Sequence, residues 1–326
     1  MWQDLIKYRD SLGLDKSVSF GLEIEFVDAN RSYVDDDVKR LYDTNKISKP
    51  WELVNEETLY DGAQIFSTRG GEAVSDIFHD TKSTWNDLDK VCCAIKKYNG
   101  KISQKCGGHV HIGANILEDN LKYYSRLAKL YVVYEDVLLR FNYGELDYPR
   151  DNLYKHAESN FSIFRHIDLF YKNDKQIRSF DEFVKAYSIF KDMAISFRRL
   201  DKNFVLSKYN GHKEIKNWYD YRTLEFRSGM GTLNKSIWQN YVNVDTKMML
   251  CCLDDNKDWD YIDRLFYDTV GNYDLEEFSD KYNLSKAVSF CNFVFDEDID
   301  KLNFLRQYIK SDAKLDKTVL VRKKKS

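Results

Sequence analysis

The sequence predicts an α+β fold with a mostly antiparallel sheet. Three observations predict this class. Strand patterns gather in the first third of the chain, helical patterns fill the middle, and one further strand pattern comes late, ahead of more helices. A doubly wound parallel sheet would instead show strands and helices in regular alternation.

The first predicted strand is residues 18–26, where apolar residues alternate with Ser, Gly and Glu. Such alternation is typical of a strand with one face in a core. Residues 31–49 are polar and are expected to form a loop. Further short strands are predicted at 51–54, 64–67, 72–74, 108–113 and 221–227.

Helices are predicted where apolar residues recur every three or four positions. Asn234 follows the glycine-rich stretch 229–231, which is expected to turn, and Asn234 should cap the next helix. The predicted helices cover 77–98, a long stretch from 121, 183–197, and 234 to about 250, with short helices after 254.

The composition excludes some classes of partner. The chain has 326 residues, of which 43% are hydrophobic, and a formal net charge of −3. This balance gives no general attraction to nucleic acid or to a membrane surface. The sequence has no apolar run of the ~20 residues that a membrane helix needs. Its first ten residues lack a signal-peptide pattern, and its six cysteines suit a reduced compartment, so a cytoplasmic location is expected.

Three short segments each place two strong polar groups two residues apart, with one apolar residue between them. On a strand, residues i and i+2 point to the same face and residue i+1 points to the other. Each segment can therefore bury its apolar residue while aiming two polar groups into a cleft that suits divalent cations and phosphate. The pairs are Glu23 with Glu25, His109 with His111, and Glu225 with Arg227.

Each segment alone also has an ordinary structural explanation. Glutamates are common on the solvent face of a strand, alternating histidines can pack across strands, and Glu225 with Arg227 can form an internal ion pair. Glu72, after two glycines, offers one more carboxylate. Neighbouring carboxylates repel, and a cation between them would favour both ionised forms.

In their order along the chain, these segments resemble the amidoligase family of the glutamine synthetase/glutamate–cysteine ligase (carboxylate–amine ligase) superfamily. The resemblance spans roughly residues 18 to 250. The matching blocks are 20–26, 71–75, 106–113 and 223–234, with Lys208–Tyr209 upstream of the last strand.

The resemblance implies a glutamine synthetase-like catalytic fold, with a curved, mostly antiparallel sheet and helices packed on one face. Residues 1–253 would form the catalytic domain, with a helical insertion at about 115–205. Residues 254–326 would be a helical C-terminal extension packed on the same domain.

The resemblance also implies an ATP-dependent ligase that joins a small-molecule or peptide carboxylate to an amine through an acyl phosphate. The cofactors would be ATP and Mg²⁺ or Mn²⁺. Neither nucleic acid nor a membrane is expected as a partner, and the oligomeric state stays open. By resemblance, Glu25 and Glu72 would hold one cation, with Glu25 also catalytic, and Glu23, His109 and Glu225 would hold another. His111 would contact the nucleotide phosphates or a third metal position, and Lys208 would contact the nucleotide. Arg227 would contact the transferred phosphoryl group.

Two other classes of function stay open. One is a metal-dependent hydrolase, or another phosphoryl-transfer enzyme, with zinc bound by His109, His111 and glutamates; no third histidine lies near this pair in the sequence. The other is a non-catalytic relative that binds a nucleotide.

Overall fold

The computed structural model describes residues 5–56, 59, 69–144, 153–161, 177–209, 217–272 and 282–310. Within them the chain forms a six-stranded sheet in the order β2-β3-β1-β4-β6-β5, and every neighbouring pair is antiparallel. The α+β class with an antiparallel sheet is therefore confirmed. The strands are β1 (Phe20–Asn30), β2 (Trp51–Val54), β3 (Arg69–Ser75), β4 (Gly107–Gly113), β5 (Ile195–Ser196) and β6 (Thr223–Met230).

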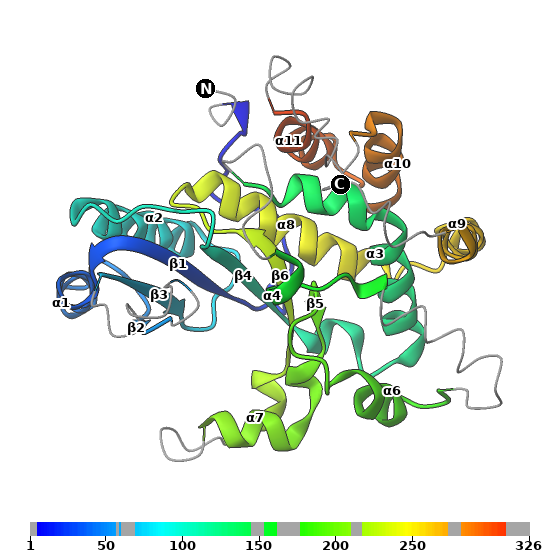
Figure 1. The fold of residues 1–326 in the computed structure, drawn as a ribbon, viewed down its shortest axis with the longest axis horizontal. Coiled ribbons are helices and arrows are strands. Elements are labelled where there is room, and N and C mark those ends of the chain that lie inside the picture. Colours follow the sequence, from blue (N-terminus) through cyan, green and yellow to red (C-terminus); the bar gives the residue numbers. More distant parts are fainter. Residues whose placement is uncertain are drawn as a thin grey trace, which may run out of the picture.

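Helices surround this sheet (Figure 1). In the described part of the chain, none of them is both long and apolar enough to cross a membrane. The α-helices are α1 (Arg31–Asp43), α2 (Lys82–Lys97), α3 (Leu121–Phe141), α4 (Leu153–His156), α6 (Phe180–Tyr187), α7 (Lys202–Tyr209), α8 (Lys235–Cys251), α9 (Trp259–Asn272), α10 (Leu284–Val294) and α11 (Asp298–Ile309). Short 3₁₀ helices are η4 (Ala114–Leu117), η5 (Arg198–Leu200) and η6 (Trp218–Tyr221).

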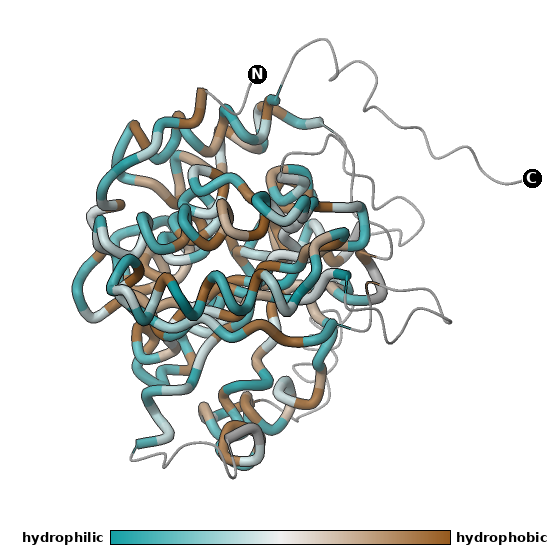
Figure 2. The backbone as a smooth tube through the Cα atoms, turned by 90° about the vertical axis from the view of Figure 1, so that its left-hand side faces the viewer, coloured by the Kyte–Doolittle hydropathy of each residue, from teal (hydrophilic) through white to brown (hydrophobic). Residues whose placement is uncertain are grey.

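One face of the sheet packs against α2 and α8. Phe20 of β1 stacks on Trp85 of α2, with ring centroids 5.3 Å apart. On β4, a Cβ atom at Gly108 would lie only 2.8 Å from the Trp238 ring of α8, so only glycine allows this close approach. Figure 2 shows hydrophobic and hydrophilic residues alternating along the same elements, as expected when each element buries one side.

The glycines near residue 230 have a different role from the predicted turn. β6 continues through Gly229 and Met230, which pair with Gly108 and Gly107 of β4. A Cβ atom at Gly229 would meet the carbonyl oxygen of Gly108 at 2.5 Å. The predicted turn at 229–231 is thus wrong over residues 229 and 230, because the glycines let two strands approach closely.

A second layer of helices covers α3 and α8 on the side away from the sheet (Figure 1). α9 packs against α3, and α11 packs against both α3 and α8. The N-terminal segment is attached to this layer, since Arg9 pairs with Asp300 of α11 at 2.6 Å.

Two predicted elements are wrong. Residues 31–43 form helix α1, whose only buried apolar residues are Val34 and Val38, so its helical pattern is faint. Its clearest signal is Asn30, whose side chain accepts hydrogen bonds from two backbone amides of the first turn. The predicted helix 183–197 ends at Tyr187 as α6, and β5 follows.

Other predicted elements fit better. The helix predicted from 77 begins at Lys82 as α2, after the capping residue Thr81. Asn234 does cap α8, accepting a hydrogen bond from the Ser236 amide at 2.9 Å. The predicted strand 64–67 lies outside the described residues.

Candidate functional site

The strand register brings the predicted polar residues together on the face opposite α2 and α8. Residues two apart on one strand share a face, and directly opposite residues on neighbouring strands are close neighbours. The opposing pairs are Glu25 with Glu72 between β1 and β3, Glu23 with His109 between β1 and β4, and His111 with Glu225 between β4 and β6.

Glu23 lies at the centre of this cluster. Its two carboxylate oxygens lie 3.0 Å from Nδ1 of His109 and 2.9 Å from Nε2 of His111. Burial disfavours the ionised carboxyl, but the charge and hydrogen bonds of the two histidines outweigh this and hold the pKa of Glu23 well below its usual value. Glu23 is therefore an anion with two imidazole partners.

The neighbouring carboxylates are less well compensated. Glu25 accepts a hydrogen bond from the backbone amide of Gly107. Glu72, directly opposite Glu25, is only 8% exposed. Burial, followed by the charges of Glu23, Glu25 and Glu56, raises the pKa of Glu72 to about 10. At neutral pH, without a cation, the Glu72 carboxyl group therefore holds a proton.

Arg227 is fixed by several partners. Its Nη1 group donates to Glu225, and its Nε group donates to the carbonyl oxygen of His156 at 3.2 Å. Its Nη2 atom lies 3.9 Å from a carboxylate oxygen of Asp192. Burial opposes ionisation of Glu225, but the adjacent Arg227 and His111 lower its pKa.

The donor set fits divalent cations. Mg²⁺ and Mn²⁺ prefer oxygen ligands and accept an imidazole among carboxylates. The Nε2 atom of His109 is buried, has no hydrogen-bond partner among the described residues, and lies 3.8 Å from Oε1 of Glu25. Three groups have ligand atoms within 4.8 Å of one another, namely Glu23–His111–Glu225, Glu23–Glu72–His109 and Glu25–Glu56–Glu72.

These groups combine the residues differently from the sequence-based assignment. That assignment put His109 with Glu23 and Glu225, and gave His111 to the nucleotide phosphates or to a third metal position. The geometry groups His111 with that pair of carboxylates, and His109 with Glu23 and Glu72. Nδ1 of His109 also lies 3.8 Å from a carboxylate oxygen of Glu225, as the sequence-based assignment expects. Of Lys208 only the position in α7 is described; its side chain lies outside the described part.

Sequence patterns alone did not reveal two residues of the site, Glu56 and Arg199. Glu56 follows β2, and its carboxylate completes the group with Glu25 and Glu72. In the sequence, Glu56 is only a glutamate just beyond a predicted strand, and glutamates are common at such positions. Arg199 of η5 brings Nη2 to 3.5 Å from Glu23, although 176 positions separate the two residues, so no local pattern could reveal this contact.

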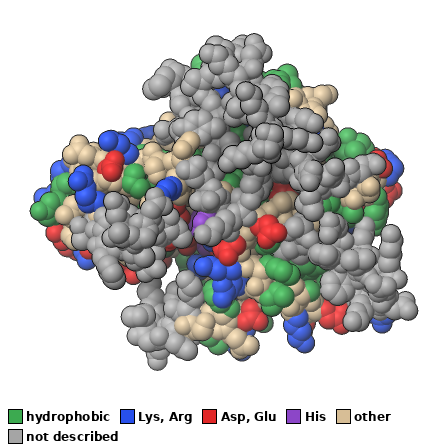
Figure 3. All heavy atoms as spheres, in the orientation of Figure 1, with side chains coloured by type: hydrophobic (Ala, Val, Ile, Leu, Met, Phe, Trp, Pro, Cys, Tyr) green, Lys and Arg blue, Asp and Glu red, His purple; other side chains and the backbone are tan. Residues whose placement is uncertain are grey.

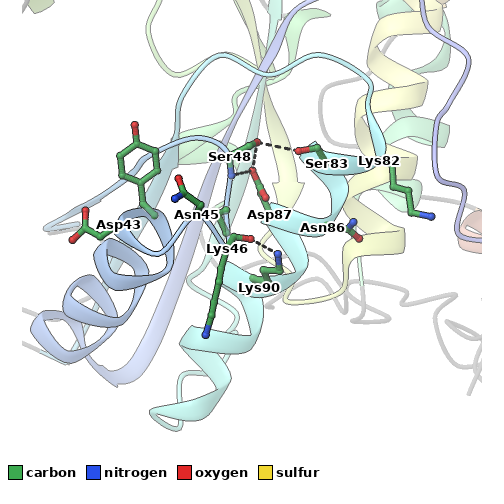
Figure 4. Close-up of a pocket in the computed structure, with 11 residues that line it drawn as sticks. Asp43, Asn45, Lys46, Ser48, Lys82, Ser83, Asn86, Asp87 and Lys90 are labelled. Carbon is green, nitrogen blue, oxygen red and sulfur yellow. Dashed lines mark hydrogen bonds between the residues drawn. The ribbon is translucent and has the colours of Figure 1, made fainter.

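The face shown in Figure 3 carries a histidine side chain near its centre, with acidic side chains beside it and basic ones just below. A separate groove of about 820 Å³ lies between the end of α1 and the start of α2 (Figure 4). Its polar groups largely bond one another: Asp87 accepts from the amide and hydroxyl of Ser48, and Lys90 donates to the carbonyl oxygen of Lys46. None of the predicted site residues lines this groove.

The sequence model of the family described as "Putative amidoligase enzyme" matches residues 16–249. The chain belongs to this family, and the family description supports a ligase activity. The match covers strands β1 to β6 and every residue of the cluster, and it ends within the last turn of α8. A comparison with curated proteins finds no match.

The raised pKa of Glu72 predicts a pH-dependent stability. In the unfolded chain this carboxyl ionises near 4.5, whereas in the folded protein it keeps its proton up to about pH 10. Unfolding therefore releases a proton at intermediate pH, and the free energy of unfolding falls as the pH rises above about 4.5. We expect Glu72→Gln, which carries no charge, to melt above the parent at pH 8 in EDTA.

This difference in melting temperature should shrink toward zero as the pH is lowered to about 4, where the parental carboxyl is protonated in both states. Glu52→Gln is the matched control, since Glu52 is an exposed carboxylate on the neighbouring strand β2. Equal melting temperatures of the Glu72→Gln variant and the parent at pH 8 would contradict the raised pKa.

Proposed function

We propose that the protein is an ATP-dependent carboxylate–amine ligase that forms an amide or isopeptide bond through an acyl phosphate. The observation that carries this proposal is the row of opposing carboxylates and imidazoles across four strands, with two arginines beside it. Like charges directly opposite each other on a sheet are destabilising. We further propose that the antiparallel sheet is the curved sheet of a glutamine synthetase-like catalytic fold.

The cluster would hold Mg²⁺ or Mn²⁺ through Glu23, Glu25, Glu72, His109 and Glu225, with Glu56 and His111 as further donors. Bound there, the cations would neutralise the phosphate oxygens of ATP as negative charge develops during transfer. The carboxylates of the protein would supply oxygen ligands, and the Gly107 amide would keep Glu25 oriented toward them.

The reaction would proceed in two steps. A carboxylate oxygen of the substrate attacks the γ-phosphorus of ATP, the bond to the bridging oxygen breaks, and ADP leaves. The amine nitrogen then attacks the acyl carbon, phosphate leaves with the carbon–oxygen electron pair, and the nitrogen loses a proton. The first step brings two anions together, so positive side chains are needed beside them.

Arg227 would contact the transferred phosphoryl group, because a guanidinium presents paired donors to phosphate oxygens. Its ion pair with Glu225 and the bond to the His156 carbonyl hold it in one orientation. Arg199, 3.5 Å from Glu23, would supply a second positive charge at the same cluster. We propose Lys208 of α7 as a further nucleotide contact, and small-molecule or peptide carboxylates and amines as the substrates.

The central test is binding of a non-hydrolysable ATP analogue, measured by titration calorimetry with Mg²⁺ or Mn²⁺ present. We expect binding that requires the cation and that weakens about 10-fold or more in Glu23→Ala, because Glu23 contributes to two of the three ligand groups. Glu52→Ala, which removes an exposed carboxylate from β2, should bind like the parent. Absence of binding with either cation would contradict the proposed function.

Arg227→Lys tests the role of the guanidinium. Lysine keeps the charge but loses the paired donors, so the kcat for ATP consumption should fall by roughly 100-fold while the affinity for ATP changes little. Arg198→Lys is the matched control, since Arg198 lies in η5 with its guanidinium over the Phe204 ring. A near-parental kcat in Arg227→Lys would leave this residue only the role of orienting Glu225.

A further inference from the structure

A buried carboxyl group on α3 lies outside the cluster and has no part in the chemistry proposed above. Glu135 is 1% exposed. Its Oε2 atom accepts a hydrogen bond from the Ser159 hydroxyl at 2.6 Å, and its Oε1 atom accepts one from the Asn160 amide at 2.9 Å. Both bonds attach the segment that follows α4 to the long helix α3.

Asn160 passes this attachment on to the edge of the sheet. Its side-chain amide donates to the carbonyl oxygen of Ile195 at 3.2 Å, and its side-chain oxygen accepts from the Ile195 amide at 2.7 Å. The side chain of Asn160 therefore pairs with β5 as a neighbouring strand would. Close by, the Ala194 amide donates to the carbonyl oxygen of Glu158 at 2.8 Å, which extends the same pairing.

The segment and β5 together hold Arg227. The backbone amide of Arg227 donates to the carbonyl oxygen of Ala194 at 2.9 Å. The Nε group of its side chain donates to the carbonyl oxygen of His156, at the end of α4. The side chain of Arg227 is thus held by the stretch from 156 to 160, and its backbone by Ala194, the residue before β5. That stretch bonds to Ala194 and Ile195, and it is attached to α3 through Glu135.

We propose that Glu135 is a positioning residue for Arg227, acting through the segment 156–160 and β5. It touches neither the cluster nor the guanidinium in any described contact, so its effect is on the orientation of Arg227. Its effect on the rate rests on the proposed function, whereas its effect on the order of β5 and of the Arg227 backbone does not.

The chemistry of this contact favours a specific role over simple core packing. Burial raises the pKa of Glu135 to about 7, against the lowering effect of the bonds from Ser159 and Asn160. Burying a polar group is unfavourable unless its hydrogen bonds are made, and an apolar residue would avoid this penalty. A carboxyl or an amide can hold this segment, and an apolar side chain cannot.

Three variants separate this role from stability alone. Glu135→Ala removes both acceptors. Glu135→Gln keeps the contacts, because its oxygen can accept from the Asn160 amide while its nitrogen donates to the Ser159 hydroxyl. Asp136→Ala is the matched control, since Asp136 is the next residue of α3 and its carboxylate pairs with Lys286 of α10 at 2.7 Å.

Amide hydrogen exchange gives the first measurement, on peptides covering 192–197 and 224–230. We expect faster exchange of both peptides in Glu135→Ala, and parental exchange in Glu135→Gln and Asp136→Ala. For ATP consumption, kcat should fall about 10-fold or more in Glu135→Ala with little change in KM, because a small displacement of a catalytic group lowers the rate strongly. Glu135→Gln should restore kcat.

Parental hydrogen exchange in Glu135→Ala would overturn the inference. An equal increase in exchange in Glu135→Ala and Glu135→Gln would also overturn it, because it would assign the effect to the charge of Glu135. If Glu135→Ala fails to fold, Ser159→Ala takes its place, since it removes one of the two bonds from the segment itself; parental exchange there would likewise overturn the inference. If the parent consumes no ATP, the proposed function fails while hydrogen exchange still decides the positioning role.

Discussion

Electrostatic repulsion among buried carboxylates on one face of the sheet is the constraint on which the rest of this structure depends. Glu25 and Glu72 lie opposite each other on neighbouring strands, and both are nearly buried. The structure relieves this repulsion with protons and positive side chains: Glu72 keeps a proton, Glu23 lies between two histidines, and Glu225 pairs with Arg227. A bound cation that took the place of the proton and the positive side chains would let every carboxylate ionise.

The other face of the sheet supplies the stability that such a cluster needs. Its strands pack aromatic and aliphatic residues against α2 and α8. Gly108 lets β4 approach Trp238 of α8 closely, and Gly229 lets β6 approach β4. The edge of the sheet near β5 serves a different purpose. There, hydrogen bonds connect the Glu135 side chain of α3 to residues 159 and 160, and the carbonyl oxygen of His156 accepts a hydrogen bond from Arg227. We propose that this connection positions Arg227 on the charged face.

The sequence predicted the central strands because strand alternation is a local property. Glu23, Glu25, His109 and His111 could be assigned to one face from spacing alone, and Asn234 revealed a helix start. Helix α1 was missed because two valines make a weak stripe among aspartates. Arg199 and Glu135 were missed because their partners lie far along the chain, and only the fold brings them together.

Anomalous diffraction from crystals grown with Mn²⁺ would test most directly the central claim, that this face of the sheet is built to hold cations. We expect Mn²⁺ bound by Glu23 together with carboxylate and imidazole groups of Glu25, Glu72, His109 and Glu225. We also expect the Nε2 atom of His109, which has no hydrogen-bond partner among the described residues, to bind the metal. Anomalous peaks confined to other parts of the surface, with the carboxylates keeping their present hydrogen bonds at saturating Mn²⁺, would contradict it.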